Sequence, residues 1–320
     1  MQALVMGGTE FISKNVAKYL ISKRYSVDIF TRGVKPLTYQ GVNAHITGDR
    51  LNIEDLRQGL NNKKYDFIFD MSAYTLAHVQ NLLAVLDKTT IKRYVFCSSG
   101  AVYTPTTSLI DEAAERGENP NWGDYGLNKK EAEDYLFNLY KTSGFPIVIF
   151  RPTYVYGEEN NLYREAFLFD RLLAELPIAI PDGTHTETQF LHIEDLVKIF
   201  ERAAHTATAI GQAYNITHPE RINWNLLLET AASIVNKRAK IVPATPAMLK
   251  MLNITARDFF PFRDVTYLLS IDKLEKSELP IPQVNLKQGL LRAYHWYAIV
   301  KPRLSDPKID KLSLLLANLS

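Results

Sequence analysis

The run Tyr125-Gly126-Leu127-Asn128-Lys129 holds two side chains whose types and spacing suit proton transfer. Residues four apart on a helix lie on one face, one turn from each other. An ammonium group beside a phenol favours the phenolate, so we expect Lys129 to lower the pKa of Tyr125 from its ordinary value of about 10. Tyr125 would then act as a general acid and base, while a hydroxyl of Ser98-Ser99 shares the substrate oxygen. The same pair is common on solvated helix faces, so the surrounding elements must decide.

The turn Gly7-Gly8-Thr9 is a candidate phosphate site. It follows the apolar run 2–6 and precedes a helical pattern over 11–22. Glycines let the backbone approach a pyrophosphate, and the next helix offers free N–H groups and the positive end of its dipole. The alternative is a tight turn without a ligand. The position directly after the first strand favours phosphate binding.

Buried strands and helices alternate through the first half of the chain. The predicted strands are 2–6, 27–31, 67–70, 93–98 and 146–150, and the predicted helices are 11–22, 54–60, 79–87 and 126–142. This alternation is typical of a parallel sheet with helices on both faces. The sequence therefore predicts an α/β protein with a Rossmann-type doubly wound parallel sheet.

Composition excludes several classes of function. The 320 residues carry a formal net charge of +2, with 46% hydrophobic and 22% charged residues, as is ordinary for a globular chain with a sizeable core. A charge this close to zero does not by itself indicate nucleic acid. The single cysteine, Cys97, rules out an intrachain disulfide framework and indicates a reducing compartment. The histidines show no metal-ligand spacing, so we expect no metal.

The sequence also lacks the features of a membrane protein. No apolar run is long enough to span a bilayer. The chain begins directly with the strand 2–6, without a basic region before an apolar one, so no signal peptide is expected. We therefore expect a cytoplasmic protein.

Five motifs together resemble a known family. They are Gly7-Gly8-Thr9-Glu10-Phe11-Ile12, Ser98-Ser99-Gly100-Ala101-Val102-Tyr103, Tyr125-x-x-x-Lys129, Arg151-Pro152-Thr153-Tyr154-Val155-Tyr156-Gly157 and Phe190-Leu191-His192-Ile193-Glu194-Asp195-Leu196. Their order and spacing are similar to those of the extended short-chain dehydrogenase/reductases, the NAD-dependent epimerase/dehydratase family that acts on nucleotide sugars. The resemblance covers roughly residues 1–300.

The resemblance implies roles for matching positions. Ser99 and Tyr125 look like the pair that handles the substrate oxygen. Lys129 resembles the lysine that holds the nicotinamide ribose and lowers the pKa of the tyrosine. Asp49 resembles the acid that contacts the adenine, with a turn cap as its alternative. The other positions implied in cofactor binding are Gly7, Gly8, Thr9, Phe11, Ile12, Thr31, Arg32, Ser72, Ala73, Tyr74, Ser98, Pro152 and Thr153.

The same resemblance implies two lobes and a dimer. The expected parts are a dinucleotide-binding domain over 1–157 completed by 187–217, a smaller and mostly helical substrate-binding lobe from 158–186 and 218–303, and a C-terminal tail over 304–320. The tail carries an amphipathic helical pattern through Leu312, Leu314, Leu315 and Leu316. By family analogy, a homodimer would form through the helices near 78–87 and 126–142.

Two departures from the family pattern concern the chemistry near the cofactor. Glu10 and Ser13 stand where the second and third glycines of the first turn are usual, and Glu10 lies near the expected phosphates. Gly100 and Ala101 replace the Asp-Glu pair of the family's 4,6-dehydratases. Dehydration by that route is therefore not expected.

A third departure concerns the substrate. Thr188-Gln189 occupy the place of an arginine that often binds the diphosphate. Arg263 resembles another diphosphate-binding position and would contact the substrate, or pair with Asp264 instead.

The end of the second strand indicates the cofactor. An acid there suits the ribose 2′-OH of NAD, whereas a cation suits a 2′-phosphate. This chain has Thr31-Arg32, followed by Gly33 and Lys35. The sequence therefore favours NADP(H) over NAD(H), with an exposed loop arginine as the alternative reading of Arg32.

These observations favour an enzyme that transfers hydride on a small molecule, a nucleotide-diphosphate sugar, by epimerisation or by ketoreduction. Relatives with a similar Gly-Gly-Thr-x-Phe turn include chloroplast stem-loop-binding proteins, which bind RNA. In that alternative, basic residues near 237–240 or 301–303 would contact phosphates. A regulator without turnover is a further alternative. The Ser-Tyr-Lys set and the near-neutral charge favour the enzyme.

Overall fold

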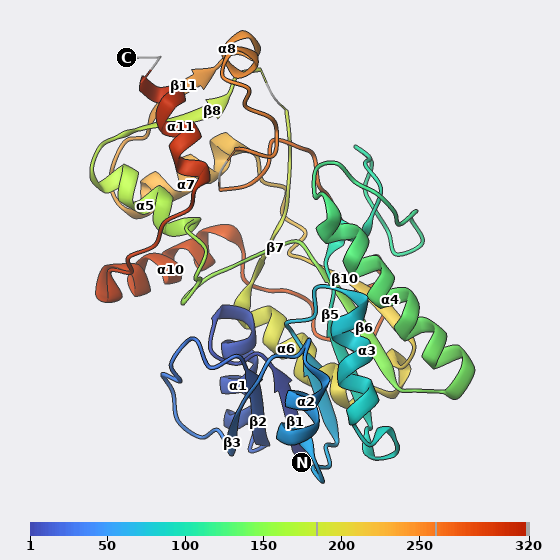
Figure 1. The fold of residues 1–320 in the computed structure, drawn as a ribbon. Coiled ribbons are helices and arrows are strands. Elements are labelled where there is room, and N and C mark those ends of the chain that lie inside the picture. Colours follow the sequence, from blue (N-terminus) through green and yellow to red (C-terminus); the bar gives the residue numbers. More distant parts are fainter. Residues whose placement is uncertain (184, 260, 318–320) are drawn as a thin grey trace.

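A parallel β-sheet forms the middle layer of the larger part of the fold, which lies in the lower half of Figure 1. The computed structural model describes residues 1–183, 185–259 and 261–317, and within them seven strands form this sheet in the order β10-β6-β5-β4-β1-β2-β3. The strands are β1 (Gln2–Met6), β2 (Ser26–Thr31), β3 (Ala44–Thr47), β4 (Phe67–Asp70), β5 (Arg93–Cys97), β6 (Ile147–Pro152) and β10 (Gln212–Ile216). Every neighbouring pair is parallel. The predicted doubly wound parallel sheet is confirmed.

The strand order reverses beside β1. β2 and β3 follow it on one side, whereas β4, β5, β6 and β10 extend from its other side. At such a reversal, the loops at the carboxyl ends of the strands separate and leave a crevice for a ligand. Gly7-Gly8-Thr9 follows β1, and Ser72-Ala73-Tyr74 comes just after β4. Both predicted cofactor segments therefore lie at this crevice.

Helices cover both faces of the sheet. α1 (Phe11–Ser22) and α6 (Ile193–His205) pack on one face, and α2 (Ile53–Leu60), α3 (Leu76–Val85) and α4 (Asp124–Ser143) pack on the other. Alternate strand residues point to opposite faces, so fully buried strands such as β5 supply apolar side chains to both cores. Short 3₁₀ turns, η1 (Lys88–Thr90), η2 (Gly100–Val102) and η3 (Ala207–Ala209), complete this part.

A second, smaller lobe has its own core. Its elements are α5 (Glu165–Leu173), β8 (Pro177–Pro181), α7 (Trp224–Ile234), β11 (Lys240–Ala244), α8 (Pro246–Met251), α10 (Leu286–Val300) and α11 (Lys308–Ala317). β8 pairs with β11 inside the lobe. β7 (Tyr154–Tyr156) pairs with β9 (Phe190–His192) between the sheet and the lobe. The short α9 (Asp272–Glu275) packs near β10. Phe169, Trp224 and Phe262 are buried in the lobe's core. The predicted helical C-terminal lobe is present.

The C-terminal tail folds onto this lobe rather than extending from it (Figure 1). The predicted amphipathic helix is α11, in which Leu312 and Leu315 are buried and Leu314 is exposed. Residues 318–320 of the predicted tail lie outside the described residues.

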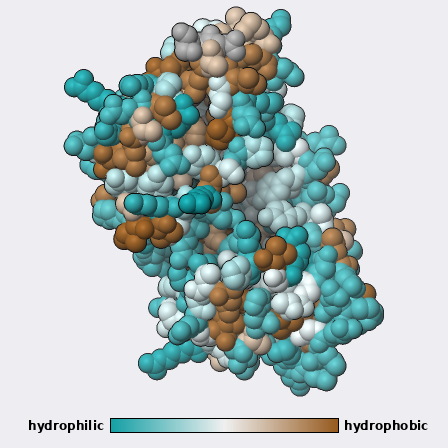
Figure 2. Space-filling model, turned by 60° about the vertical axis from the view of Figure 1, so that its left-hand side comes forward, coloured by the Kyte–Doolittle hydropathy of each residue, from teal (hydrophilic) through white to brown (hydrophobic). Residues whose placement is uncertain are grey.

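The surface is mainly hydrophilic with separate apolar patches on the face shown in Figure 2. On α10, the exposed apolar side chains include Leu291, Ile299 and Val300. Among the described helices, none is long and apolar enough to cross a membrane.

Candidate active site

The start of α4 brings Tyr125 and Lys129 against η2, which begins directly after Ser99. Gly126 makes this approach possible. A Cβ atom there would lie 2.0 Å from the carbonyl oxygen of Ala101, far inside van der Waals contact. Any side chain at this position would therefore push α4 away from η2 and separate Tyr125 from Ser99.

Ser99, Tyr125 and Lys129 come together as predicted. The Ser99 hydroxyl accepts a hydrogen bond from the N–H of Ala101 (3.1 Å) and lines one cavity with the phenols of Tyr125 and Tyr267, the second of which the sequence did not single out. The Lys129 Nζ donates to the carbonyl oxygen of Cys97 (2.6 Å) and lies 6.0 Å from the ring centroid of Tyr125. A hydroxyl, a phenol and a buried cation thus share one small site.

The predicted effect of Lys129 on Tyr125 is wrong for this structure. Burial raises the pKa of Tyr125 above its ordinary value, and the hydrogen bond from Ser99 lowers it only in part. Tyr125 keeps 38% of its surface accessible, but it lines a cavity whose walls replace bulk water. Lys129 is itself desolvated, and burial lowers its pKa. Desolvation is the largest cause for both groups and disfavours the charged form of each.

We therefore expect Tyr125 to stay protonated at neutral pH in the ligand-free chain. Because the folded-state pKa is raised, the phenolate should form only above about pH 10, the ordinary value for tyrosine. NMR of protein labelled with ¹³C at the tyrosine Cζ atoms measures this, with Tyr125→Phe to assign the signal. A Tyr125 signal that titrates near neutral pH would contradict the expectation.

The glycine turn after β1 borders a groove of about 560 Å³. Gly7 and Gly8 have φ values of +103° and +128°, and a Cβ at either would lie 2.7 Å from an atom of Ser13 or Ile29. Only glycine fits this backbone. α1 follows with Glu10 as its N-cap residue, which makes no side-chain capping bond. The first N–H groups of α1 are thus left without a side-chain acceptor at its N-terminus.

Most of the predicted cofactor residues line this groove. They are Gly7, Thr9, Phe11, Ile12, Thr31, Arg32, Asp49, Ser72 and Tyr74. Gly8 and Ala73 are buried beside it instead. The exposed Glu10 also lines it, and its carboxylate accepts a hydrogen bond from Asn161 (3.3 Å). Asp49 accepts from the N–H of Leu51 (2.9 Å), so it caps a turn as well as facing the groove.

A buried ion pair holds the segment after β4. Arg50 pairs with Asp70 (2.8 Å), and the same guanidinium donates to the hydroxyl of Ser72. Asp70 also accepts from the N–H of Ala73 (3.1 Å). Burial alone would raise the pKa of Asp70, but Arg50 and Tyr94 outweigh it and lower that pKa. The pair fixes one wall of the groove, a role that the sequence did not reveal.

A second cavity, of about 420 Å³, adjoins the groove. Phe11, Ile12, Met71, Tyr74 and Leu162 line both spaces. The remaining predicted residues line this second cavity: Ser98, Ser99, Tyr125, Lys129, Pro152, Thr153 and Arg263. The structure thus brings the predicted site residues to two connected spaces.

Two arginines face the second cavity. The guanidinium carbon of Arg263 lies 4.7 Å from the ring centroid of Trp122. The backbone N–H of Arg263 donates to the phenol oxygen of Tyr154. Arg164, which the sequence did not single out, lies 5.1 Å from the ring centroid of Tyr154. The alternative that Arg263 pairs with Asp264 is not seen, although Asp264 accepts a hydrogen bond from Thr186. Both guanidinium groups are available to an anion in the cavity.

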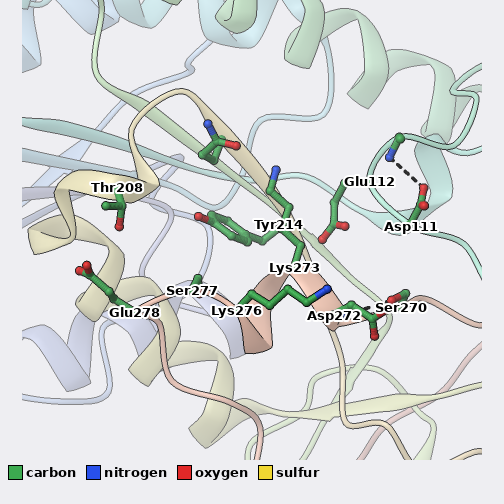
Figure 3. Close-up of a pocket in the computed structure, with 12 residues that line it drawn as sticks. Asp111, Glu112, Thr208, Tyr214, Ser270, Asp272, Lys273, Lys276, Ser277 and Glu278 are labelled. Carbon is green, nitrogen blue, oxygen red and sulfur yellow. Dashed lines mark hydrogen bonds between the residues drawn. The ribbon is translucent and has the colours of Figure 1, made fainter.

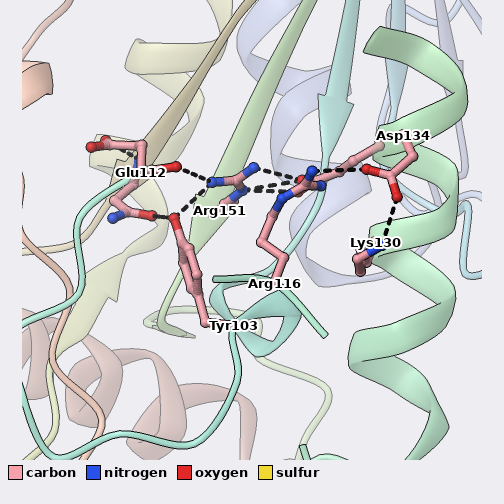
Figure 4. A network of polar contacts seen from close by, with 8 residues as sticks. Tyr103, Glu112, Arg116, Lys130, Asp134 and Arg151 are labelled. Carbon is pink, nitrogen blue, oxygen red and sulfur yellow. Dashed lines mark hydrogen bonds and ion pairs between the residues drawn. The ribbon is translucent and has the colours of Figure 1, made fainter. Parts of the chain in front are cut away.

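A polar network fixes α4 to the sheet (Figure 4). The buried Glu133, one turn beyond Lys129, accepts hydrogen bonds from Arg151 (2.7 Å) and Arg116 (2.8 Å). Arg151 also donates to the phenol of Tyr103 (2.7 Å). The network sets how α4 lies on β6, and with it the positions of the candidate catalytic side chains.

A separate cavity of about 800 Å³ lies beside β10 (Figure 3). Its lining includes Glu112, Tyr214 and Lys273, and it shares no residue with the two connected spaces. Lys273 lies 5.1 Å from the ring centroid of Tyr214, and burial raises the pKa of Glu112. This cavity is distinct from the candidate active site.

Comparison with known proteins identifies the family. The model of the NAD dependent epimerase/dehydratase family matches residues 3–217. The chain belongs to the NAD dependent epimerase/dehydratase family. The resemblance to extended short-chain dehydrogenase/reductases, read from the five motifs, is confirmed.

The proteins that this chain resembles have names that indicate different functions. A chloroplast stem-loop binding protein of 41 kDa from Arabidopsis thaliana is 26% identical over 91% of this chain and 78% of its own length. A putative UDP-glucose 4-epimerase from Methanocaldococcus jannaschii is also 26% identical, over 92% of this chain and 97% of its own. The structure of Thermus thermophilus UDP-glucose 4-epimerase in complex with NAD has a TM-score of 0.76 at 18% identity, covering 94% of this chain and all of that chain. The last likeness shows the shared fold.

The groove fits the nicotinamide dinucleotide that the epimerase/dehydratase family implies. Its glycine turn has no room for a Cβ, and the N-terminus of α1 faces it. Beyond it, the buried Ser98 hydroxyl has no hydrogen-bond partner among the described residues, yet Ser98 lines the adjoining cavity. An orphaned buried hydroxyl at this place is expected where a ligand completes the site.

Proposed function

We propose that this chain is an NAD(P)-dependent epimerase or reductase that acts on a nucleotide-diphosphate sugar. The observation that carries the proposal is the set Ser99, Tyr125 and Lys129 in a cavity that continues into the glycine-turn groove. Hydride transfer to or from a sugar carbon requires a proton-transfer group and, next to it, a groove that can hold a dinucleotide. Here the cavity with Tyr125 and the groove share a wall.

In the proposed mechanism, Tyr125 exchanges a proton with the sugar oxygen while hydride leaves or reaches the attached carbon. The nicotinamide, when bound, supplies the acceptor and donor of that hydride. Ser99, which lines the same cavity as Tyr125, would hydrogen-bond the same oxygen. Lys129 stabilises the phenolate that forms, because its ammonium is buried nearby and held by the Cys97 carbonyl. Removal of hydride and its return to the other face of the same carbon would give epimerisation, whereas delivery of hydride from reduced nicotinamide to a bound ketone, followed by release of the alcohol, would give reduction.

The second cavity supports a nucleotide-diphosphate sugar as the substrate class. Arg164 and Arg263 face it and would bind a diphosphate, for which planar guanidinium groups are well suited. The names of the two UDP-glucose 4-epimerases support a sugar nucleotide. Gly100 and Ala101 in place of an acid-base pair argue against dehydration.

Mass spectrometry of small molecules released by denaturing the purified protein tests this proposal. A retained dinucleotide or sugar nucleotide would support it. If the released fraction is empty, titration with both cofactors and with UDP-glucose follows. Binding of neither class of ligand would refute the proposed function.

The choice of cofactor is the finer part of the proposal. We propose a preference for NADP(H), because Arg32 and Lys35 both line the groove after β2, where no acid follows the strand. We expect Arg32→Ala to weaken NADPH binding about tenfold or more, since a hydrogen bond to a charged group contributes about 1.5–3 kcal/mol, and to leave NADH binding unchanged. Fluorescence titration measures both affinities. Arg57→Ala, at an exposed arginine of α2, is the matched control. Equal losses for NADPH and NADH would refute the 2′-phosphate role.

RNA binding is a second candidate, because the Arabidopsis relative is a stem-loop binding protein. Of the basic residues considered for it, Lys237 already pairs with Glu175 (2.7 Å). Titration of an RNA hairpin at increasing salt separates the candidates, since phosphate contacts give a steep loss of affinity with salt. The enzyme proposal predicts no such binding.

The lobe boundaries, the homodimer through α3 and α4 and the cytoplasmic location stay predictions.

A further inference from the structure

The C-terminal segment reaches the second cavity. After α10, Lys301 adopts a left-handed conformation with φ of 47°, and the chain turns back towards the lobe (Figure 1). α11 then packs with Leu312 and Leu315 in the lobe core. Lys311 pairs with Asp258 (2.9 Å) on the loop that leads to Arg263. The segment is therefore anchored both by apolar burial and by this ion pair.

The anchored segment contributes Asp306 and Lys308 to the lining of the cavity. Among the described residues that line it, Asp306 is the one acid. The charged residues around it are Lys129, Arg164, Arg263, Lys308 and Asp306, so four cations face one carboxylate. None of Arg164, Arg263 and Lys308 forms an ion pair with an acid of the described residues. Such an excess of one charge in a partly desolvated space favours an anionic ligand.

The positive charges of Lys308, Arg164 and Arg263 also influence one another. Burial lowers the pKa of Lys308, and the charges of Arg263 and Arg164 lower it further, while Asp306 and Asp258 oppose them. Burial likewise lowers the pKa of Arg263. All three groups line the same cavity, so the negative charge of a ligand bound there would relieve this repulsion.

We propose that the segment 304–317 is part of the substrate site and that Lys308 binds the diphosphate of the ligand together with Arg164 and Arg263. This inference rests on the proposed function, because it names a residue that completes the same site. The two arginines provide planar donors, and Lys308 provides a compact point charge in the lining of the same cavity. The tail thereby selects ligands that carry two adjacent phosphates over neutral sugars.

Calorimetric titration with UDP tests the proposal, and NADPH titration of the same samples reports an intact fold. We expect Lys308→Met to weaken UDP binding about tenfold or more, in line with the loss of one charge-assisted hydrogen bond. Lys308→Arg should restore most of the affinity. Lys287→Met, which removes an exposed charge from α10 outside both cavities, should bind UDP like the wild type. NADPH affinity should be the same in all four proteins.

The outcomes separate this inference from the proposed function. Equal UDP affinity in Lys308→Met and Lys287→Met would overturn the role of Lys308 and leave the enzyme proposal standing. If the wild type does not bind UDP, inorganic pyrophosphate is titrated instead. Pyrophosphate binding that is lost in Lys308→Met would support the diphosphate site and refute only the nucleotide sugar. Binding of neither probe would overturn both.

Discussion

Replacing Tyr125 by Phe is expected to lower the turnover of a nucleotide sugar by about 10²–10⁴-fold, the usual contribution of a general acid or base. The phenol lines the cavity together with Ser99, and its ring centroid lies 6.0 Å from the Lys129 ammonium. The substitution removes only its oxygen, so the ring still packs against Tyr74. Cofactor affinity should therefore be retained. Steady-state kinetics and a cofactor titration measure the two effects separately.

Tyr74→Phe is the matched control. Tyr74 lines the same cavity, its ring lies 6.0 Å from that of Tyr125, and it also loses only a hydroxyl. We expect a small effect on turnover, because no proton passes through Tyr74 in the proposed mechanism. Wild-type turnover in Tyr125→Phe would remove this residue as the acid and base. Equal losses in the two variants would show that the site needs both hydroxyls for binding rather than for chemistry.

Glu133→Gln is expected to destabilise the fold by about 3–5 kcal/mol, because it leaves a buried arginine without its charged partner. Arg151 is 2% exposed and Glu133 is fully buried, and they share a short ion pair (2.7 Å). Denaturant unfolding monitored by fluorescence measures the loss. Because Glu133 lies on α4 one turn beyond Lys129, the variant should also lose turnover at temperatures where it remains folded.

Asp134→Asn provides the comparison for this network. Asp134 is the next residue on α4, pairs with Arg116 and Lys130, and has a side chain that is 43% exposed. Solvent-exposed ion pairs typically contribute less than about 1 kcal/mol, so this variant should unfold close to the wild type. If the two substitutions cost the same, the burial of the Arg151–Glu133 pair would not be what fixes α4.

The parts of the site that could be predicted from the sequence are local. Tyr125 and Lys129 share a helix face because of their spacing alone, and Gly7-Gly8 follows the first strand directly. The sheet was predictable because buried parallel strands are continuous apolar runs. β3, β7, β8 and β11 were not predicted. β3 alternates between half-buried and exposed residues, and β11 is mostly exposed and contains Pro243. Neither has the apolar run of a buried strand.

What could not be predicted depends on contacts between distant segments. Tyr267 reaches Ser99 from the second lobe, and Lys308 reaches the cavity from the tail. The pKa of Tyr125 also depends on such contacts, because its burial comes from walls that several loops supply. Spacing along the helix shows that a lysine is near, whereas the degree of desolvation becomes visible only in the folded chain.

The most direct test of the account is absorbance at the reduced-nicotinamide band when a UDP-sugar is added to protein loaded with oxidised cofactor. Hydride transfer at the site predicts a rise in absorbance with the wild type and none with Tyr125→Phe, although both bind the sugar nucleotide. Binding of the sugar nucleotide by the loaded wild type, with no change in absorbance and no altered sugar among the products, would contradict the proposed chemistry.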